Sequence, residues 1–262
     1  MQPSTNHHSE WLLDAERTGL FACDSSCGPY HLLAPLLHSV KHFLSYEHYP
    51  ELIRAVLANA GPGPIRVLLA GAESEESVAA FLRASHGLVD RLDVLDRCAT
   101  PLRRISANRE ASDPAIGCIH GDILLNRFDL TYQVAVADSF LKQFPMTEKR
   151  NVLASLRAAV DPGGWLLLRE YTGDLSALLG EFWPRLIERL RQAGWQTVAS
   201  QDAQGELIRV MPALESWMRS KGVAYEAQDQ LISDIEASGL TVEFVNRAEG
   251  ADFLIVGCRR PV

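Results

Sequence analysis

The sequence has 262 residues, a length that fits one large domain or a core domain carrying an insertion. Hydrophobic residues make up 47% and charged residues 22%, so the composition is globular and excludes a wholly disordered or fibrous chain. The 33 acidic residues outnumber the 25 basic ones and give a formal net charge of −8, whereas a nucleic-acid-binding face usually needs a basic excess. We therefore expect no nucleic-acid partner. The acidic balance favours small neutral or cationic ligands, or serves solubility alone.

The sequence also bears on location. No apolar stretch approaches the ~20 residues that span a bilayer. Residues 1–10 are polar and lack the apolar centre of a secretory signal. The five cysteines are odd in number and mostly scattered, which does not indicate a disulfide framework. We expect a cytoplasmic protein with no membrane partner.

The first part of the chain has a helical pattern. Leucines recur at helical spacing over residues 33–44, and a second helix is expected over residues 49–59. The run Gly61-Pro62-Gly63-Pro64 breaks any regular element and marks a boundary. Residues 1–62 are therefore interpreted as a helical segment that acts as a lid, contacts the substrate or forms a homodimer.

From residue 63 onward, strands alternate with helices. Strands are expected over residues 65–70, 92–95, 116–119, 130–137 and 165–168, and helices over residues 75–85, 100–108 and 148–160. This alternation predicts an α/β fold, a Rossmann-like doubly wound sheet of mostly parallel strands with helices on both faces.

The rest of the chain completes this domain. Residues 176–238 are expected to form a helical insertion, followed by two last strands over residues 241–246 and 253–258. The loop between these strands is too short for the dozen-residue crossover that a parallel pair requires, so the last strand is expected to be antiparallel. Residues 63–262 are thus predicted to be one domain with a seven-stranded sheet.

Ligands of such sheets bind beyond the carboxyl ends of the strands. After the first strand come Gly71, Ala72 and Glu73, and a dinucleotide fingerprint would need glycine instead of Glu73 and Glu76. Carboxylates at the start of a helix also occupy the electropositive end that otherwise receives phosphate. NAD, FAD and nucleoside triphosphates are therefore disfavoured. Alternatively, Ser74 caps the helix and the glutamates complement its dipole.

Acidic residues follow the next two strands. Asp96, with Arg97 beside it, can accept hydrogen bonds from both hydroxyls of a ribose; a solvated loop aspartate is the alternative. Asp122 can accept a hydrogen bond from an adenine amino group while Ile123 packs on the ring, and a structural turn is the alternative. The two ligand-binding interpretations together place an adenosine at this edge of the sheet.

The fourth strand is followed by Asp138, Ser139 and Phe140, and then by Gln143. In this fold class, that position faces the reacting end of a ligand. We expect Asp138 and Ser139 to contact the cofactor, and Phe140 and Gln143 to contact the substrate.

Residues 129–168 comprise a strand, a helix and the turn Asp161-Pro162-Gly163-Gly164 before the next strand. Together with residues 91–102 and Gly121-Asp122, they resemble the class I S-adenosylmethionine-dependent methyltransferases. The resemblance covers residues 65–170 well and the last two strands loosely. It implies S-adenosylmethionine as the cofactor and methyl transfer to a small-molecule oxygen or nitrogen nucleophile, such as that of a secondary metabolite. The implied cofactor-binding residues are Gly71, Ala72, Glu73, Asp96, Arg97, Asp122, Ile123, Asp138 and Ser139.

The first motif departs from the family pattern, which has an acidic residue two positions before a loop of three alternating glycines. This sequence has Leu69 in the acidic position, keeps Gly71, and has Glu73 and Glu75 in place of the later glycines. We expect Glu73 to bind the ammonium of the cofactor's methionine end. Alternatively, the cofactor site is impaired and the fold serves as a non-methylating binding or assembly protein.

Histidines and cysteines are concentrated near the start of the chain. Cys23, Cys27 and His31 have a metal-like spacing, but structural zinc sites usually use a shorter cysteine spacing, so no metal is expected. Tyr30, His31 and His38 are instead expected to line a substrate pocket. His31 is the first candidate for a general base, since histidine titrates near neutral pH.

Overall fold

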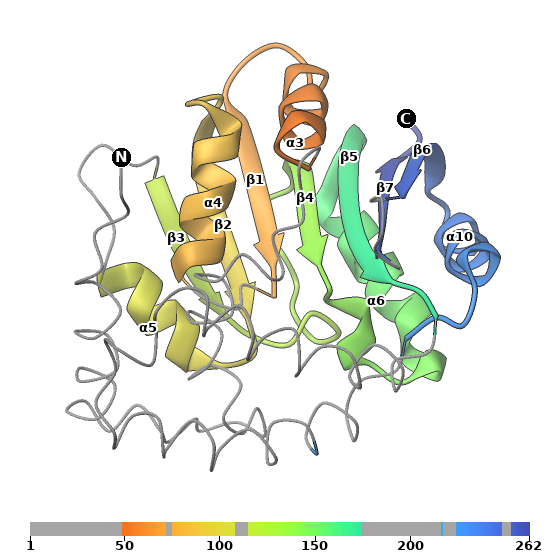
Figure 1. Cartoon of the computed structure of the whole chain (residues 1–262). Coiled ribbons are helices and arrows are strands. Elements are labelled where there is room, and N and C mark those ends of the chain that lie inside the picture. The colour runs from red at the N-terminus through yellow and green to blue at the C-terminus, as the bar shows by residue number, and fades with distance from the viewer. Residues whose placement is uncertain (1–48, 72–74, 108–114, 174–215, 217–223, 248–252) are drawn as a thin grey trace, which may run out of the picture.

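The computed structural model describes residues 49–71, 75–107, 115–173, 216, 224–247 and 253–262. Its centre is a seven-stranded sheet with the strand order β3-β2-β1-β4-β5-β7-β6 (Figure 1). The strands are β1 (Ile65–Ala70), β2 (Val89–Asp96), β3 (Ala115–His120), β4 (Tyr132–Asp138), β5 (Val160–Tyr171), β6 (Thr241–Arg247) and β7 (Phe253–Arg259).

The strand directions confirm the predicted fold class. β1 pairs in parallel with both β2 and β4, β2 with β3, and β4 with β5. β7 lies antiparallel between β5 and β6. The short connection from β6 to β7 therefore has the consequence expected from its length.

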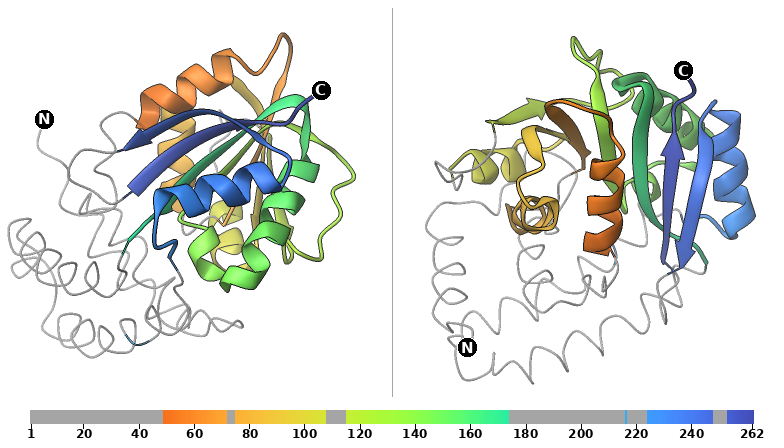
Figure 2. Two further views of the ribbon diagram at one scale, coloured as in Figure 1. Left: turned by 90° about the vertical axis from the view of Figure 1, so that its right-hand side faces the viewer. Right: turned by 90° about the horizontal axis from the view of Figure 1, so that it is seen from above.

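Helices cover both faces of the sheet (Figure 2). On one face, α3 (Tyr49–Ala58), α4 (Glu75–Ser85) and α5 (Ala99–Ala107) pack on apolar side chains such as Val67 and Leu69 of β1. On the other, α6 (Met146–Ala159) and α10 (Gln228–Ala237) pack on Leu68 and on Leu166 of β5. A short 3-10 helix, η1 (Leu141–Gln143), follows β4.

Burial explains the composition of the strands. The central strands β1 and β4 are buried along nearly their whole length and are therefore almost continuously apolar. The edge strand β6 alternates between exposed and half-buried side chains. α3 buries Ile53, Val56 and Leu57 against the same core as α4, so this helix is part of the layer that covers the sheet.

The start of β5 differs from the prediction. Val160 was expected to end a helix, but it pairs with Tyr132 as the first residue of the strand. The register then shifts, so that Val134 pairs with Trp165 and the turn over residues 161–164 bulges out of the ladder. The prediction was wrong here because proline and glycine are rare inside strands.

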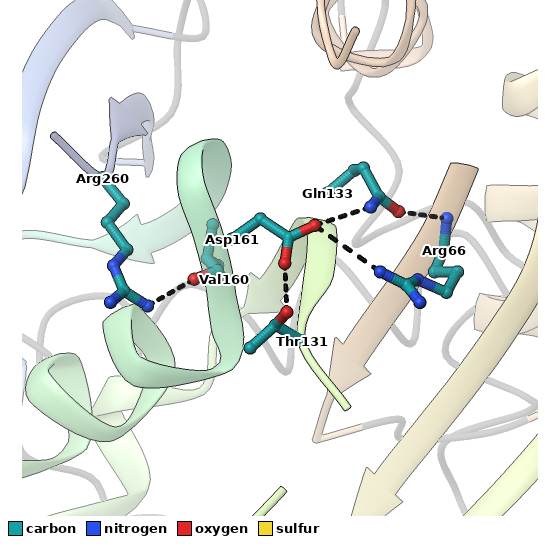
Figure 3. A network of polar contacts seen from close by, with 6 residues as sticks. All are labelled: Arg66, Thr131, Gln133, Val160, Asp161 and Arg260. Carbon is teal, nitrogen blue, oxygen red and sulfur yellow. Dashed lines mark hydrogen bonds and ion pairs between the residues drawn. The ribbon is translucent and has the colours of Figure 1, made fainter. Parts of the chain in front are cut away.

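A polar network holds this bulge (Figure 3). The Asp161 carboxylate accepts hydrogen bonds from the Thr131 hydroxyl and, at 2.6 Å, from the Gln133 side-chain amide. The Gln133 oxygen in turn accepts the backbone N–H of Arg66 at 2.9 Å. Arg260 donates to the carbonyl of Val160 at 2.6 Å. These contacts tie β1, β4 and the chain end to β5, at the amino edge of the parallel strands.

Three further observations concern the expectations above. Residues 1–48 and most of the expected insertion lie outside the described residues, so the division into residues 1–62 and 63–262 stays a prediction. Among the described helices, none is long and apolar enough to cross a membrane. The described cysteines Cys98, Cys118 and Cys258 are free thiols.

Candidate functional site

The carboxyl ends of the parallel strands meet at one edge of the sheet. Ala70, the last residue of β1, pairs with Leu95 of β2 on one side and with Ala137 of β4 on the other. Asp96 pairs with His120 at the end of β3. The strand order reverses between β1 and β4, and such a switch point opens the crevice in which α/β proteins bind ligands. The residues that follow these strands therefore define the candidate site.

Gly71 occupies the centre of this edge. Its φ is +75°, a conformation that favours glycine, and its N–H donates to the Leu95 carbonyl at 2.8 Å. A Cβ at this position would lie only 2.3 Å from Cδ2 of Phe140. Glycine is thus required both by the backbone conformation and by the Phe140 ring, which fills the space that a side chain would take.

Asp96 and Asp122 each fix a local turn. An Asp96 carboxylate oxygen accepts the N–H of Cys98 at 2.6 Å, and an Asp122 carboxylate oxygen accepts the N–H of Leu124 at 2.9 Å. The Asp96 carbonyl also accepts the N–H of Gly121, so the two loops lie next to each other. Both carboxylates are half-buried at the site edge. The turn roles are thus present, and the ribose and adenine roles stay predictions.

Two neighbouring predicted residues have different surroundings. The Arg97 side chain is exposed, and its carbonyl lies 3.1 Å from Nε2 of His120. Ile123 is only 2% exposed and packs in the core with Leu141 and Leu95. Contact of Ile123 with an adenine ring remains a prediction.

The loop after β4 is held in a strained conformation. Ser139 has a φ of +50°, which is unfavourable for a residue with a Cβ. Its N–H donates to the Arg169 carbonyl at 2.6 Å. Asp138 accepts a hydrogen bond from Nε of Arg169 at 2.6 Å, and the Arg169 guanidinium lies over the Phe253 ring. Asp138, at 31% side-chain exposure, is the more accessible partner of this ion pair, since Arg169 is 6% exposed.

Glu170, the next residue of β5, is almost fully buried below this loop. Its carboxylate accepts the N–H groups of Phe140 at 2.8 Å and of Leu141 at 2.7 Å. Burial raises the pKa of Glu170 to about 7, although the Leu141 hydrogen bond and the charges of Lys142 and Lys149 oppose the rise. Burial likewise lowers the pKa of Lys149 to about 8.

Three residues at this edge were not predicted from the sequence, namely Tyr49, Arg169 and Glu170. Tyr49 begins α3, and its pKa is raised by burial and by the charges of Asp138 and Glu170. The only sequence signal was the pair Arg169-Glu170, two charged residues that directly follow an apolar strand segment. A buried charged group needs a compensating partner. Titratable groups with perturbed pKa values tend to cluster at functional sites, so such a pair is a candidate site feature.

The structure brings together Gly71, Asp96, Asp122, Asp138 and Phe140 from four different loops. Ser139 belongs to the same loop as Phe140, and Gln143 lies half-buried in η1. The predicted residues Tyr30, His31, His38, Ala72 and Glu73 lie outside the described residues. In the ranges that the structure describes, no three histidine, cysteine, aspartate or glutamate side chains are grouped as metal ligands.

Comparison with known proteins shows which structures share this fold. No protein-family model matches the sequence, and neither does any curated protein sequence. Among solved structures, the N-methyltransferase NodS from Bradyrhizobium japonicum WM9, in complex with S-adenosyl-L-homocysteine, matches with a TM-score of 0.52. It is 18% identical over 82% of this chain and 87% of its own.

Two other structures match over most of both chains. The 1,6-didemethyltoxoflavin-N1-methyltransferase from Burkholderia thailandensis, with bound 1,6-didemethyltoxoflavin and S-adenosylhomocysteine, has a TM-score of 0.57 and 13% identity. The match covers 100% of this chain and 93% of that enzyme. The [4+2]-cyclase SpnF has a TM-score of 0.59 and 13% identity, covering 89% of this chain and 94% of its own. This chain therefore has the Rossmann-like fold of the class I S-adenosylmethionine-dependent methyltransferases.

Proposed function

We propose that this protein transfers a methyl group from S-adenosylmethionine to a small-molecule acceptor. The observation that carries the proposal is the switch point between β1 and β4, with Gly71 directly after β1 and Asp96 at the end of the neighbouring strand β2. Two methyltransferases that share the fold were solved with S-adenosylhomocysteine, the product of that cofactor.

The residues of this edge fit such a cofactor. The Gly71 backbone and the Phe140 ring that packs against it would together line one side of the cofactor. Asp96 is oriented by the Cys98 amide and would accept hydrogen bonds from the ribose hydroxyls. Asp122, beside it, would accept the adenine amino group. Asp138 and Ser139 would face the sulfur end, with Arg97 at the rim.

The methionine end of the cofactor needs a carboxylate for its ammonium. Leu69, in the position where the family has an acidic residue, is 5% exposed and packs in the core beside α4. Its aliphatic side chain has no atom that can accept a hydrogen bond from the ammonium. We assign this role to Glu73, with Ala72 contributing its backbone.

Methyl transfer is an in-line displacement on a carbon that the cofactor's sulfonium activates, so the protein mainly has to align the reactants. Gln143, Tyr30 and His38 are assigned to the acceptor side, and Phe140, which packs against Gly71, is assigned to both the acceptor and the cofactor. His31 is assigned as the general base that accepts the proton of an oxygen nucleophile. A nitrogen nucleophile with a free lone pair needs no such base.

A second function is open to the same fold. SpnF, named as a [4+2]-cyclase, shares the architecture with a TM-score of 0.59. The changed first motif, with Leu69 and Glu73, is the sequence feature that favours a non-methylating binding or assembly protein.

Calorimetric titration with S-adenosylmethionine and S-adenosylhomocysteine tests the proposal. We expect micromolar dissociation constants for both ligands and no comparable binding of NAD or ATP. A panel of small phenols and amines, incubated with methyl-labelled S-adenosylmethionine, then reports label transfer. Absence of binding at millimolar ligand would refute the proposed function, and binding without label transfer to any acceptor would favour the second function.

A further inference from the structure

The loop over residues 139–141 connects β4 to η1 and carries the conformational strain of the site. Ser139, with its φ of +50°, has a backbone conformation that is unfavourable for a residue with a Cβ. Such a conformation persists only where surrounding contacts determine it. The contacts that do so all come from β5, which is adjacent to β4 in the sheet.

Glu170 supplies two of these contacts. One carboxylate oxygen, Oε1, accepts both successive N–H groups, from Phe140 at 2.8 Å and from Leu141 at 2.7 Å. Glu170 is 1% exposed and Leu141 is fully buried, so water cannot replace the Leu141 hydrogen bond, while Phe140 itself is half-buried. Without this acceptor, the buried Leu141 N–H would lack a partner and the half-buried Phe140 N–H would lose the same acceptor, which is unfavourable.

These two hydrogen bonds fix the backbone at Phe140 and thereby the position of the Phe140 ring. One side of the Phe140 ring meets Phe144, with 5.1 Å between the ring centroids in an edge-to-face arrangement. Another part of the ring lies against Gly71, where it fills the space that a side chain would take. The Phe140 ring therefore forms part of the wall beside the turn after β1.

We propose that Glu170 is a positioning residue, which clamps the loop over residues 139–141 and thereby sets the Phe140 wall of the cofactor pocket beside Gly71. This inference rests on the proposed function, because it assigns the wall to S-adenosylmethionine. Glu170 itself does not touch the cofactor and acts through the loop.

The buried surroundings of Glu170 suit a clamp. Lys149 of α6 is fully buried, and its ammonium lies 4.2 Å from the centroid of the Tyr225 ring. The charge of Lys149 stabilises the carboxylate of Glu170, which offsets part of its desolvation. The Tyr225 hydroxyl and Arg150 in turn donate hydrogen bonds to Asp234 of α10. The clamp is thus supported by α6 and α10, away from the ligand edge.

Two substitutions separate reach from charge. Glu170→Asp keeps the charge but is shorter by one methylene, so it cannot bond both N–H groups. Glu170→Gln keeps the length and an acceptor oxygen but loses the charge. We expect Glu170→Asp to weaken S-adenosylhomocysteine binding about tenfold and to speed amide hydrogen exchange at Phe140 and Leu141 by a similar factor. Glu170→Gln should stay within about threefold of the wild type in both measurements.

A matched control removes a carboxylate at the other end of the same strand, β5. Asp161→Ala deletes the acceptor of Thr131 and Gln133 and lowers stability, but it leaves residues 139–141 untouched. It should bind S-adenosylhomocysteine as the wild type does. If Asp161→Ala weakens binding as much as Glu170→Asp, the effect is one of general stability and the inference is wrong.

The outcomes distinguish this inference from the proposed function. If the wild type does not bind S-adenosylhomocysteine, the proposed function fails, while faster exchange at Phe140 and Leu141 in Glu170→Asp still supports the clamp. If the wild type binds and Glu170→Asp binds equally well, the inference is overturned. Should Glu170→Asp not fold, Phe140→Ala tests the wall directly: a tenfold loss of S-adenosylhomocysteine affinity supports the inference, and wild-type affinity overturns it.

Discussion

Asp96 is the residue to which we assign recognition of the cofactor's ribose. One of its carboxylate oxygens is engaged by the Cys98 N–H at 2.6 Å, which fixes the orientation of the side chain at the end of β2. A carboxylate oriented in this way needs no reorganisation to meet a ribose, and preorganisation of this kind favours binding.

Asp96→Asn should therefore weaken S-adenosylhomocysteine binding without unfolding the protein. The asparagine oxygen can keep the Cys98 hydrogen bond, whereas the charge that strengthens the ribose hydrogen bonds is lost. We expect a loss of roughly 1.5–3 kcal/mol in binding, the usual range for a hydrogen bond to a charged group. Calorimetry measures it, and Asp129→Asn, in an exposed loop position, is the control. An unchanged dissociation constant would remove Asp96 from the site.

At the scale of elements, the bulged start of β5 shows how side chains define a strand that its own sequence does not favour. The segment over residues 161–164 contains proline and two glycines. Its place in the sheet depends on Asp161, whose carboxylate receives hydrogen bonds from Thr131 and Gln133 of the β4 region.

Asp161→Ala should lower the free energy of unfolding by about 1–3 kcal/mol, because it leaves the Gln133 amide and the Thr131 hydroxyl without their acceptor. The Arg66 guanidinium, 3.6 Å from the same carboxylate, adds a weaker ion pair that salt screens. Urea denaturation measures the change, and Thr131→Val tests the hydroxyl separately. A stability equal to that of the wild type would mean that the turn over residues 161–164 does not depend on the Asp161 carboxylate.

Elements with a clear local pattern could be predicted from the sequence, and elements with a tertiary cause could not. β1 and α4 have the predicted bounds, Ile65–Ala70 and Glu75–Ser85, since an apolar run next to glycine and an amphipathic period both mark their own ends. The first residues of β5 and the 3-10 helix η1 depend on contacts with residues far away in sequence. Val160 of β5 pairs with Tyr132, and Leu141 of η1 donates to Glu170. No local pattern encodes such contacts.

The same distinction holds for the site of the whole molecule. Gly71, Asp96 and Asp138 could be placed at one edge because the carboxyl ends of parallel strands always meet there. Glu170 and Tyr49 were missed because they reach this edge from β5 and from a helix before the first strand. Their burial, which gives them their role, is a property of the assembled fold and has no periodic signature in sequence.

Burial of Glu170 also links its charge to the stability of the whole molecule. Its pKa rises from 4.5 to about 7 through burial, so the folded protein binds this proton more tightly than the unfolded chain. The charged groups that face it are Asp138 of β4, Lys142 of η1 and Lys149 of α6. The stabilising contribution of the protonated group is complete at low pH and is lost as the pH rises through about 7.

Glu170→Gln does not titrate, so its stability should depend differently on pH. Between about pH 5 and 6.5, the free energy of unfolding of the wild type should fall relative to Glu170→Gln. The difference should be at most about 1.4 kcal/mol per pH unit, the limit for one proton. Urea denaturation of both proteins across this range measures the difference, with Asp161→Asn as a control that keeps Glu170. Parallel stability curves would show that Glu170 is already ionised in the folded protein throughout the range, and that Lys149 and the two loop N–H groups outweigh its burial.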